Sequence, residues 1–473
     1  MPGTPTLTRR ELSRIRREDY ALADVPDWYR GYGLISLFSV LLAIPSALVF
    51  LAVGGGLEVA YGTHALLWGL IIVTIVVSLV GFVLVYAAST SGLDSDLMTI
   101  VAGYGYRGSA ITSLIYGINF LILYSLENTI IVSAIHARFP NIETWPIQIG
   151  IGVALAICVW YGLHRLTKVM LFTGPVAFGL VIWLLVKVGH PVSGFWSRGG
   201  ADHSSIGIGI LQVVAALLAF IVNATVGADV GRFVRPKQRA AGSVLLGVGL
   251  QLFAFLGATL VGAWLTVQLH GDVNPGSYIV EILGSAGLIY IIVIQVRINS
   301  INIYSGSLAF SNFGARALNF SPGRQFWLMG LIVSGSILTV TSIYAHLLGV
   351  LTFESVFVMA WVMSVVGFLV RRRFWKLPAR PWFGRYSLVD GTSGRGLATL
   401  AIALAVSTPV AFGALGTDSE AWAPVVSGAI AFGAAYLFHR YDPEDLCRYD
   451  GASRERVRPV CEATPPQIAC PLI

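Results

Sequence analysis

The chain has few charged residues for its length. Only 12% of its 473 residues are Asp, Glu, Lys or Arg, whereas charged residues make up about 25% of an average soluble domain. Hydrophobic residues account for 56%, and long apolar runs rather than amphipathic periods fill the chain from about residue 30 to residue 438. Runs of about 18 or more apolar residues are typical of helices that span a bilayer. The sequence therefore predicts an all-α, polytopic membrane protein.

Features of enzymes and metal proteins are also scarce. The four cysteines fit no zinc-ligand spacing, and the predicted spans contain no nucleophile–base pair or metal cluster. We therefore expect no enzyme activity, no metal and no cofactor, and we expect the spans themselves to carry the function. The polar segments are short: an N-terminal tail at 1–28, a basic loop at 371–395 and a C-terminal tail at 439–473.

The hydropathy pattern predicts about twelve transmembrane helices. If helices 1–5 (residues 29–192) and 6–10 (206–370) form two repeats, the odd number per repeat makes the second inverted relative to the first. Two further helices occupy 396–438. The predicted spans are 30–58, 64–89, 108–134, 146–164, 166–187, 206–229, 240–269, 285–309, 325–343, 346–370, 396–415 and 420–438.

The formal net charge of +7 follows the membrane topology. With both termini inside, only Arg138, Lys187 and Arg198 of the 31 Lys and Arg residues fall outside, and Arg297 is intramembrane. This is the positive-inside pattern. It explains the basic charge without a nucleic-acid partner, and it predicts a plasma (inner) membrane protein with cytoplasmic N and C termini that contacts lipid. The oligomeric state is left open.

Two predicted spans carry potential helix breaks. The first contains Pro45, Gly54 and Gly55, and the sixth contains Asn223 and Gly227. Proline removes a backbone hydrogen bond and glycine makes unwinding easy. Interruptions at matching places in two repeats indicate a transporter site at the midplane, although Pro and Gly are also commoner in membrane helices generally. We expect these five residues to act as hinges.

Two ionisable residues lie deep in predicted spans, Glu127 in the third and Arg297 in the eighth. Such residues are rare in membranes and mark functional sites by default. Two interpretations stay open. They form an ion pair that locks helix packing, or they bind substrate directly and stand in for a coupling cation.

Span eight is polar on two faces. On a helical wheel Gln295, Asn299 and Asn302 share one face, and Arg297 lies on nearly the opposite side with Ser300. Neither face can meet lipid, so other helices should enclose this span. Asn299 and Asn302 are candidates for substrate binding or for interhelical hydrogen bonds.

The polar residues near the ends of spans two and six give weaker signals. Asp229 and Arg232 have the pattern of a charge pair at a helix end, with a gating or structural role. Asp94 and Asp96 fall in a predicted loop, where we expect them to be solvated.

Three stretches resemble a known transporter family: "SGLDSDLMTIVAGYGYRGSAITSLIYG", "ADVGRFVRP" and "NIYSGSLAFSNF". They are similar to the purine–cytosine permease branch of the nucleobase:cation symporter-1 family. The likeness runs from about residue 19 to residue 316 and more weakly to the end. It implies a LeuT-like five-plus-five inverted repeat with two extra C-terminal helices. It also implies alternating access to a planar heterocyclic substrate between spans one, three, six and eight.

The resemblance assigns roles to individual positions. The family's substrate-contacting glutamine falls on Glu127, and its stacking tryptophan falls on Leu123, with Tyr124 beside it. The second stacking aromatic falls near Phe220, and the amide of span eight falls on Asn302. Tyr124 and Phe220 are therefore expected to stack on a ligand, with packing as the alternative.

Span eight departs from the sodium-coupled members of the family at the small hydroxyl residues that bind sodium there. Val296 and Arg297 occupy these positions. Valine offers no oxygen, and arginine brings its own positive charge. Arg297 is therefore expected to replace the sodium ion electrostatically, so we expect coupling to a proton, or exchange, rather than sodium coupling.

The sequence thus predicts a secondary active transporter that imports a small nitrogenous heterocycle, such as a purine, a pyrimidine or a hydantoin-like molecule. Two alternatives remain at this point. One is a transporter-like receptor that senses a small ligand without net flux. The other is a transporter of an amine or an amino acid.

Overall fold

The computed structural model describes residues 24–160, 163–189, 194–201, 205–341, 343–371 and 394–438. The C-terminal tail, most of the N-terminal tail and nearly all of the basic loop that the sequence predicts lie outside these residues. Helices dominate the described chain, and its one β-bridge, between Tyr32 and Val234, is isolated. The predicted all-α class is confirmed.

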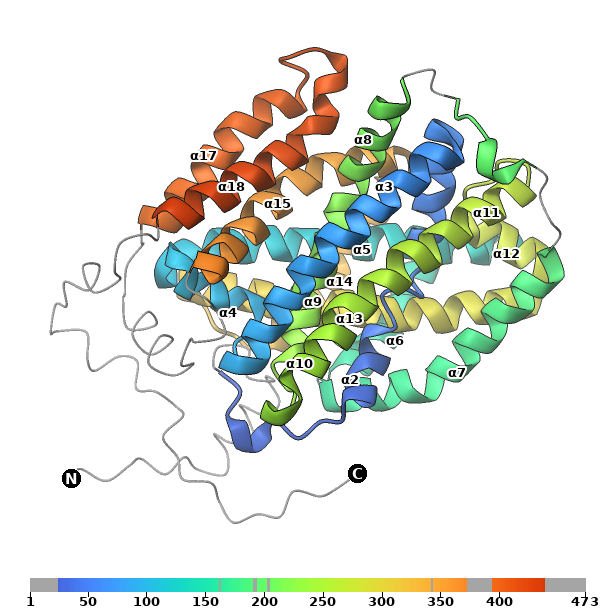
Figure 1. Ribbon diagram of the computed structural model, residues 1–473. Helices are drawn as coiled ribbons and strands as arrows, with labels where there is room; N and C mark the ends of the chain where they lie inside the picture. The colour runs from blue at the N-terminus through green and yellow to red at the C-terminus, as the bar shows by residue number, and fades with distance from the viewer. Residues whose placement is uncertain are drawn as a thin grey trace, which may run out of the picture.

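The α-helices follow the chain in one order (Figure 1). They are α2 (Leu34–Leu41), α3 (Leu48–Ser91), α4 (Ser95–Thr99), α5 (Gly105–Arg138), α6 (Thr144–Val159), α7 (Leu163–Val188), α8 (Ile206–Leu217), α9 (Val222–Gly231), α10 (Arg239–Gly242), α11 (Leu260–Gln268), α12 (Pro275–Leu283), α13 (Ser285–Ala317), α14 (Arg324–Val340), α15 (Leu347–Arg371), α17 (Gly394–Ala411) and α18 (Ala423–Phe438).

Short 3-10 and π-helical segments connect or extend these helices. The 3-10 segments are η1 (Asp27–Tyr29), η3 (Phe195–Ser197), η4 (Leu218–Ile221), η5 (Pro236–Gln238), η8 (Ile343–His346) and η10 (Thr417–Trp422). The π segments are η2 (Ile100–Tyr104), η6 (Ser243–Gly249) and η7 (Leu252–Thr259).

The helices reproduce the predicted order of spans. In the described chain eight continuous helical stretches are long and apolar enough to cross a membrane, and shorter apolar helices occupy the predicted positions of spans four, five and nine. Helix α3 joins the first two spans but departs from helical geometry at Gly62, whose φ is +80°. An added Cβ at Gly62 would lie 2.5 Å from the carbonyl oxygen of Arg198, so only glycine fits this kink.

The core of the bundle is formed by helices from both predicted repeats. Helix α5 packs along α13, and α3 packs along both α9 and α11. Helices α17 and α18 lie together at one side, against α15 (Figure 1). The polar span α13 is enclosed, as predicted: Gln295, Arg297, Asn299 and Asn302 are all at most 2% exposed.

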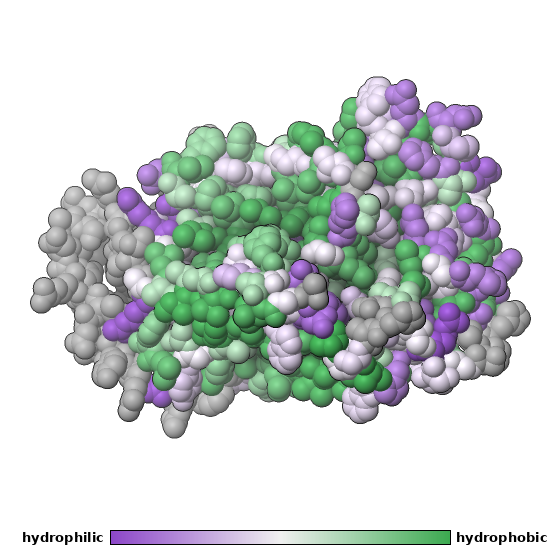
Figure 2. Space-filling model, turned by 90° about the horizontal axis from the view of Figure 1, so that it is seen from above, coloured by the Kyte–Doolittle hydropathy of each residue, from purple (hydrophilic) through white to green (hydrophobic). Residues whose placement is uncertain are grey.

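The outer helices present apolar side chains to the surroundings. On α6, Ile149, Val153 and Ile157 are exposed at helical spacing, and α14 exposes Val333 and Ile337 in the same way. Figure 2 shows a broad hydrophobic area on one face, with hydrophilic residues gathered mainly toward one end. Exposed apolar stripes of this kind are stable against lipid chains, in keeping with a multi-pass membrane protein.

Candidate ligand-binding site

Two helices that contact the core are interrupted. Helix α2 ends at Leu41 and α3 begins at Leu48, with Pro45 in the turns between them. Helix α8 changes to the 3-10 segment η4 before α9 begins. The first interruption lies where Pro45 predicts it. Because a broken backbone at membrane depth must line a cavity or be buried in protein, these two sites are where a ligand site can form.

The glycines of α3 are not hinges. Gly54 and Gly55 lie within its regular part. An added Cβ at Gly54 would lie 1.9 Å from the carbonyl oxygen of Thr259, and one at Gly55 would lie 2.1 Å from the hydroxyl of Thr266. Both glycines instead let α3 approach η7 and α11 closely, so the prediction that they interrupt the helix is wrong.

The interruption of span six lies just before the predicted residues. Gly227 is inside α9, and an added Cβ there would lie 3.0 Å from the carbonyl oxygen of Leu246. It is therefore a packing position. Asn223 lies in the first turn of α9, directly after η4. The hinge prediction is thus wrong for Gly227, and Asn223 adjoins the hinge rather than forming it.

Glu127 of α5 reaches the interruption of the first helix. Its Oε1 accepts a hydrogen bond from the backbone N–H of Val49 at 3.2 Å, and its Oε2 accepts one from Gln295 Nε2 at 2.7 Å. Ala47, which precedes α3, has no side chain that can cap the helix. The first N–H groups of a helix lack partners within it and attract negative charge. Glu127 therefore caps α3 from another helix.

Residues from both interruptions enclose a small cavity. All the lining residues are at most 8% exposed, so the site is occluded. Three of them, Glu127, Asn223 and Asn302, carry polar side chains into an otherwise apolar lining. The lining residues are Ile44, Ala47, Val49, Phe50, Phe120, Leu123, Glu127, Phe220, Asn223, Val226, Ile298, Ile301 and Asn302. The structure thus brings together Glu127, Phe220 and Asn302, which the sequence singled out separately.

Three phenylalanines form the apolar part of this lining. The rings of Phe50 and Phe220 have centroids 4.6 Å apart at an interplanar angle of 38°. Phe120 lies on α5 and packs on Tyr116, with centroids 4.7 Å apart. Aromatic faces suit a flat ligand. Sequence reasoning missed Phe50. The signal was its place in the first turn after Pro45, on the helix whose N-terminus Glu127 caps.

The amide side chains around the cavity keep unused hydrogen-bonding capacity. Asn302 Nδ2 donates to Asn299 Oδ1 at 3.3 Å. Within the described chain the other amide groups find no partner at Asn223 Nδ2, Asn299 Nδ2 or Gln295 Oε1. Asn299 does not line the cavity and acts on it through Asn302. Buried polar atoms in need of partners are expected where a polar ligand is to be held.

Tyr124 does not line the cavity. An added Cβ on Gly335 would lie 2.2 Å from Tyr124 Cδ1, so the ring packs tightly against α14. Leu123, the preceding residue of α5, lines the cavity instead. The predicted stacking role of Tyr124 is therefore wrong, because a one-residue step turns a side chain by about 100° on a helix.

Arg297 is 1% exposed and lies on the side of α13 away from Glu127. Its Nη1 donates to the hydroxyl of Thr173 on α7 at 2.8 Å, and its Nη2 donates to the carbonyl oxygen of Ser39 at 3.5 Å. Ser39 is in the last turn of α2, where carbonyl groups attract positive charge. Among the described ion pairs none joins Arg297 to Glu127. The direct ion pair is therefore not formed, while the role of Arg297 as a cation substitute stays a prediction.

A separate network of buried charges lies where α3 and α9 end and α4 begins. Asp94 accepts a hydrogen bond from the N–H of Leu97 at 2.7 Å, which caps α4. Its other oxygen pairs with Arg232 Nη1 at 2.7 Å. Asp94 is 3% exposed and Arg232 is fully buried. The expectation that Asp94 is solvated is wrong, because α4 folds against α9 instead of forming an open loop.

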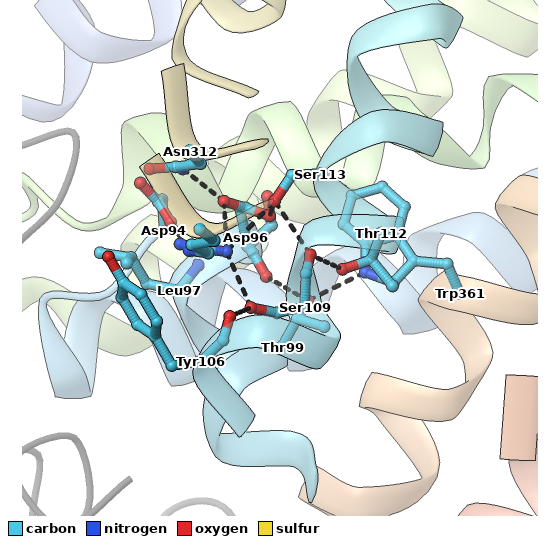
Figure 3. Close-up of polar contacts among 12 residues, drawn as sticks. Asp94, Asp96, Leu97, Thr99, Tyr106, Ser109, Thr112, Ser113, Asn312 and Trp361 are labelled. Carbon is cyan, nitrogen blue, oxygen red and sulfur yellow. Dashed lines mark hydrogen bonds and ion pairs between the residues drawn. The ribbon is translucent and has the colours of Figure 1, made fainter. Parts of the chain in front are cut away.

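Asp96 is the second acid of this network (Figure 3). It pairs with Arg316 at 3.1 Å and accepts hydrogen bonds from Ser113 and Asn312. Arg316 also donates to the hydroxyl of Ser109 at 3.0 Å. Asp96 is 3% exposed, so its predicted solvation is also wrong. These contacts hold α4 to α5 and α13.

Asp229 completes the network from α9. Its Oδ1 accepts hydrogen bonds from the N–H and the hydroxyl of Ser95, at 3.0 and 2.6 Å, and its Oδ2 accepts one from the hydroxyl of Tyr116 at 2.7 Å. The network therefore fixes the second half of the broken span six to α4 and α5. It closes one end of the bundle beside the cavity.

Metal binding has little support in the described part of the chain. No group of three or more His, Cys, Asp or Glu residues there is placed to hold a metal ion.

Comparison with solved structures identifies the fold. A structure of Mhp1, a nucleobase-cation-symport-1 family transporter, in a closed conformation with bromovinylhydantoin bound, matches with a TM-score of 0.67 at 17% identity, covering 92% of this chain and 98% of that one. A Na⁺-coupled sialic acid symporter matches with a TM-score of 0.57 at 14% identity, covering 90% and 91%. A manganese transporter from Eremococcus coleocola matches with a TM-score of 0.54 at 11% identity, covering 88% and 97%.

At these identities the comparisons establish the fold alone. The chain has the LeuT-like architecture of secondary transporters, as its sequence predicts. No protein-family model and no curated protein sequence matches the chain.

Proposed function

We propose that the protein is a secondary active transporter that imports a small nitrogenous heterocycle by alternating access. A purine, a pyrimidine or a hydantoin-like molecule is the substrate class. The observation that carries this proposal is the occluded cavity between the two helix interruptions, which combines aromatic faces with Glu127, Asn223 and Asn302. Flat rings with N–H and C=O groups match both parts of this lining.

The position of Glu127 restricts the charge of the substrate. The N-terminus of a broken helix is a ready site for an anionic substrate group. Here the carboxyl group of Glu127 already occupies the N-terminus of α3, through Val49. A substrate carboxylate would compete with it and be repelled. The substrate is therefore neutral or cationic, and it presents an N–H group to Glu127.

Arg297 supports transport without sodium. Its guanidinium donates to a carbonyl oxygen of α2 and to α7. It thereby places a permanent positive charge between α13 and the first broken helix. A bound cation would meet repulsion from this charge. We therefore assign the coupling role to a proton, or the transport mode to exchange.

A protonated amine is the second candidate substrate. Within the described chain no cation forms an ion pair with Glu127, so a cationic ligand could provide the missing charge. Amino acids fit less well, because their carboxylate meets the same repulsion as any other anion.

Thermal stabilisation of the purified protein tests the proposal. The panel contains uracil, adenine, a 5-substituted hydantoin, a primary amine and an amino acid, each with sodium or potassium. A ligand at a hundredfold excess over its Kd stabilises by about 2.7 kcal/mol. We expect stabilisation by heterocycles that does not depend on sodium. Stabilisation by the amine alone would favour the second candidate, and a strict requirement for sodium would refute the role of Arg297.

A further inference from the structure

Glu354 of α15 is a buried carboxyl group outside the candidate site. It is 6% exposed, and its Oε1 accepts a hydrogen bond from Asn119 Nδ2 of α5. Its Oε2 is buried and has no partner in the described chain. The same holds for Oδ1 of Asn119, which is itself only 1% exposed. Two adjacent side chains therefore each keep one unsatisfied oxygen.

Other buried carboxyl groups of the described chain are better compensated. Each has either an arginine or at least two hydrogen-bond donors. Asp94, Asp96 and Glu58 pair with arginines, Glu127 accepts two hydrogen bonds, and Asp229 accepts three. Glu354 has one neutral donor. An ionised carboxylate is not tolerated in an apolar interior with so little compensation, and such a group takes up a proton instead.

A single proton resolves both unsatisfied atoms. An ionised Glu354 has only acceptor oxygens, and Oδ1 of Asn119 is also an acceptor, so the two cannot bond. A protonated Oε2 is a hydroxyl donor and can bond to Asn119 Oδ1. Together with the existing bond from Asn119 Nδ2, this makes a cyclic acid–amide pair with two hydrogen bonds.

We propose that Glu354 is a proton-binding site, occupied in this closed state and held by Asn119 across the contact of α5 with α15. The proton is taken from water onto Oε2 and returned to water when α5 and α15 separate enough to hydrate the carboxyl group. A carboxylate left by that release cannot re-enter the apolar contact without a new proton. Only the use of this proton in transport rests on the proposed function; the site itself does not.

The site lies next to the candidate cavity. Asn119 precedes the cavity-lining Phe120, so the two side chains leave α5 in directions about 100° apart, one toward α15 and one toward the cavity. Helix α15 also packs along η4, the interruption of span six. Rearrangement of η4 on ligand binding would therefore move the contact that protects the proton.

Other titratable groups in this region already have partners. One turn from Asn119, the ring of Tyr116 packs on Trp361 of α15 with centroids 4.8 Å apart, and its hydroxyl donates to Asp229. On η2, the hydroxyl of Tyr104 is hydrogen-bonded to Ser364 of α15. Among the described residues Asn119 is the group that bonds to Glu354.

Infrared difference spectroscopy of the purified full-length protein tests the proposal. The carbonyl band of a protonated carboxyl group should be present near neutral pH, shift in deuterated water and be lost in Glu354→Gln. The matched control is Glu281→Gln, because Glu281 is exposed on α12 and should leave the band unchanged. The glutamine amide can still bond to both atoms of Asn119, so Glu354→Gln should fold normally.

A second variant separates the site from a folding defect. In Asn119→Ala the carbonyl of Glu354 loses its donor, so the band should move to higher frequency while Glu354 is still protonated. A Glu354→Gln spectrum identical to that of the wild type would overturn the proposal. So would an unshifted band in Asn119→Ala. Neither readout requires a transported compound, so failure here is distinct from failure of the proposed function.

Discussion

The buried pair of Asp94 and Arg232 gives the sharpest stability prediction. Replacing Arg232 by methionine leaves Asp94 buried without its cation, at 3% exposure. Removing one partner of a buried ion pair costs about 3–5 kcal/mol. We expect Arg232→Met to lower the unfolding free energy by this amount. Asp229 lies in the same network, so its negative charge adds to the cost.

The second half of the prediction concerns the double variant. Asp94→Asn removes the charge but keeps an oxygen that can accept the capping hydrogen bond from Leu97. In the double variant with Arg232→Met no charge of the pair is left uncompensated. It should therefore be more stable than Arg232→Met alone, with an interaction energy of about 2–3 kcal/mol in the double-mutant cycle.

Unfolding in mixed detergent micelles measures all three variants against the wild type. Arg235→Met is the matched control, because Arg235 is exposed three residues away and bonds to the carbonyl oxygen of Gly31. Loss of an exposed contact of this kind costs about 0–1 kcal/mol. Equal stability of Arg232→Met and Arg235→Met would refute the argument, and so would strict additivity of the two changes in the pair.

Three further predictions concern the packing, the cavity and the cation. Gly54→Ala should destabilise by about 1–3 kcal/mol in the same assay, because its Cβ would meet Thr259, whereas Gly56→Ala, with no atom closer than 3.8 Å, should not; equal costs would contradict the packing. Glu127→Gln should weaken binding of uracil or of a primary amine by about ten- to a hundredfold in calorimetry, because a bond to a charged group contributes about 1.5–3 kcal/mol; unchanged binding would remove Glu127 from the site. Arg297→Ser should lower the thermal midpoint, with recovery in sodium but not in potassium; equal effects of both salts would count against the cation-substitute role.

The sequence predicts the fold well because membrane spans carry a local signal. Long apolar runs mark the order of the helices whatever their partners are. Pro45 likewise marks the first interruption, since proline acts on its own turn. The second interruption, η4, has the sequence Leu-Ala-Phe-Ile and contains neither glycine nor proline. Its position depends on tertiary packing, so the expectation fell on Asn223 and Gly227 instead.

The candidate site is predicted less well because its contacts are not local. Glu127 and Asn302 can be singled out as polar residues within spans, but the partners of Glu127 come from 78 and 168 residues away. Nothing in the local pattern distinguishes Leu123, which lines the cavity, from Tyr124, which packs on α14. The burial of Asp94 and Asp96 also depends on distant arginines.

Uptake into proteoliposomes tests the central claim most directly. The purified protein is reconstituted and supplied with radiolabelled uracil, adenine and a 5-substituted hydantoin, in sodium or potassium, with and without an inward proton gradient. We predict uptake of at least one heterocycle that is equal in the two salts, and that is lost when cavity-lining Asn302 is replaced by leucine. Binding of these compounds without any flux would favour a receptor, and flux that requires sodium would contradict the account.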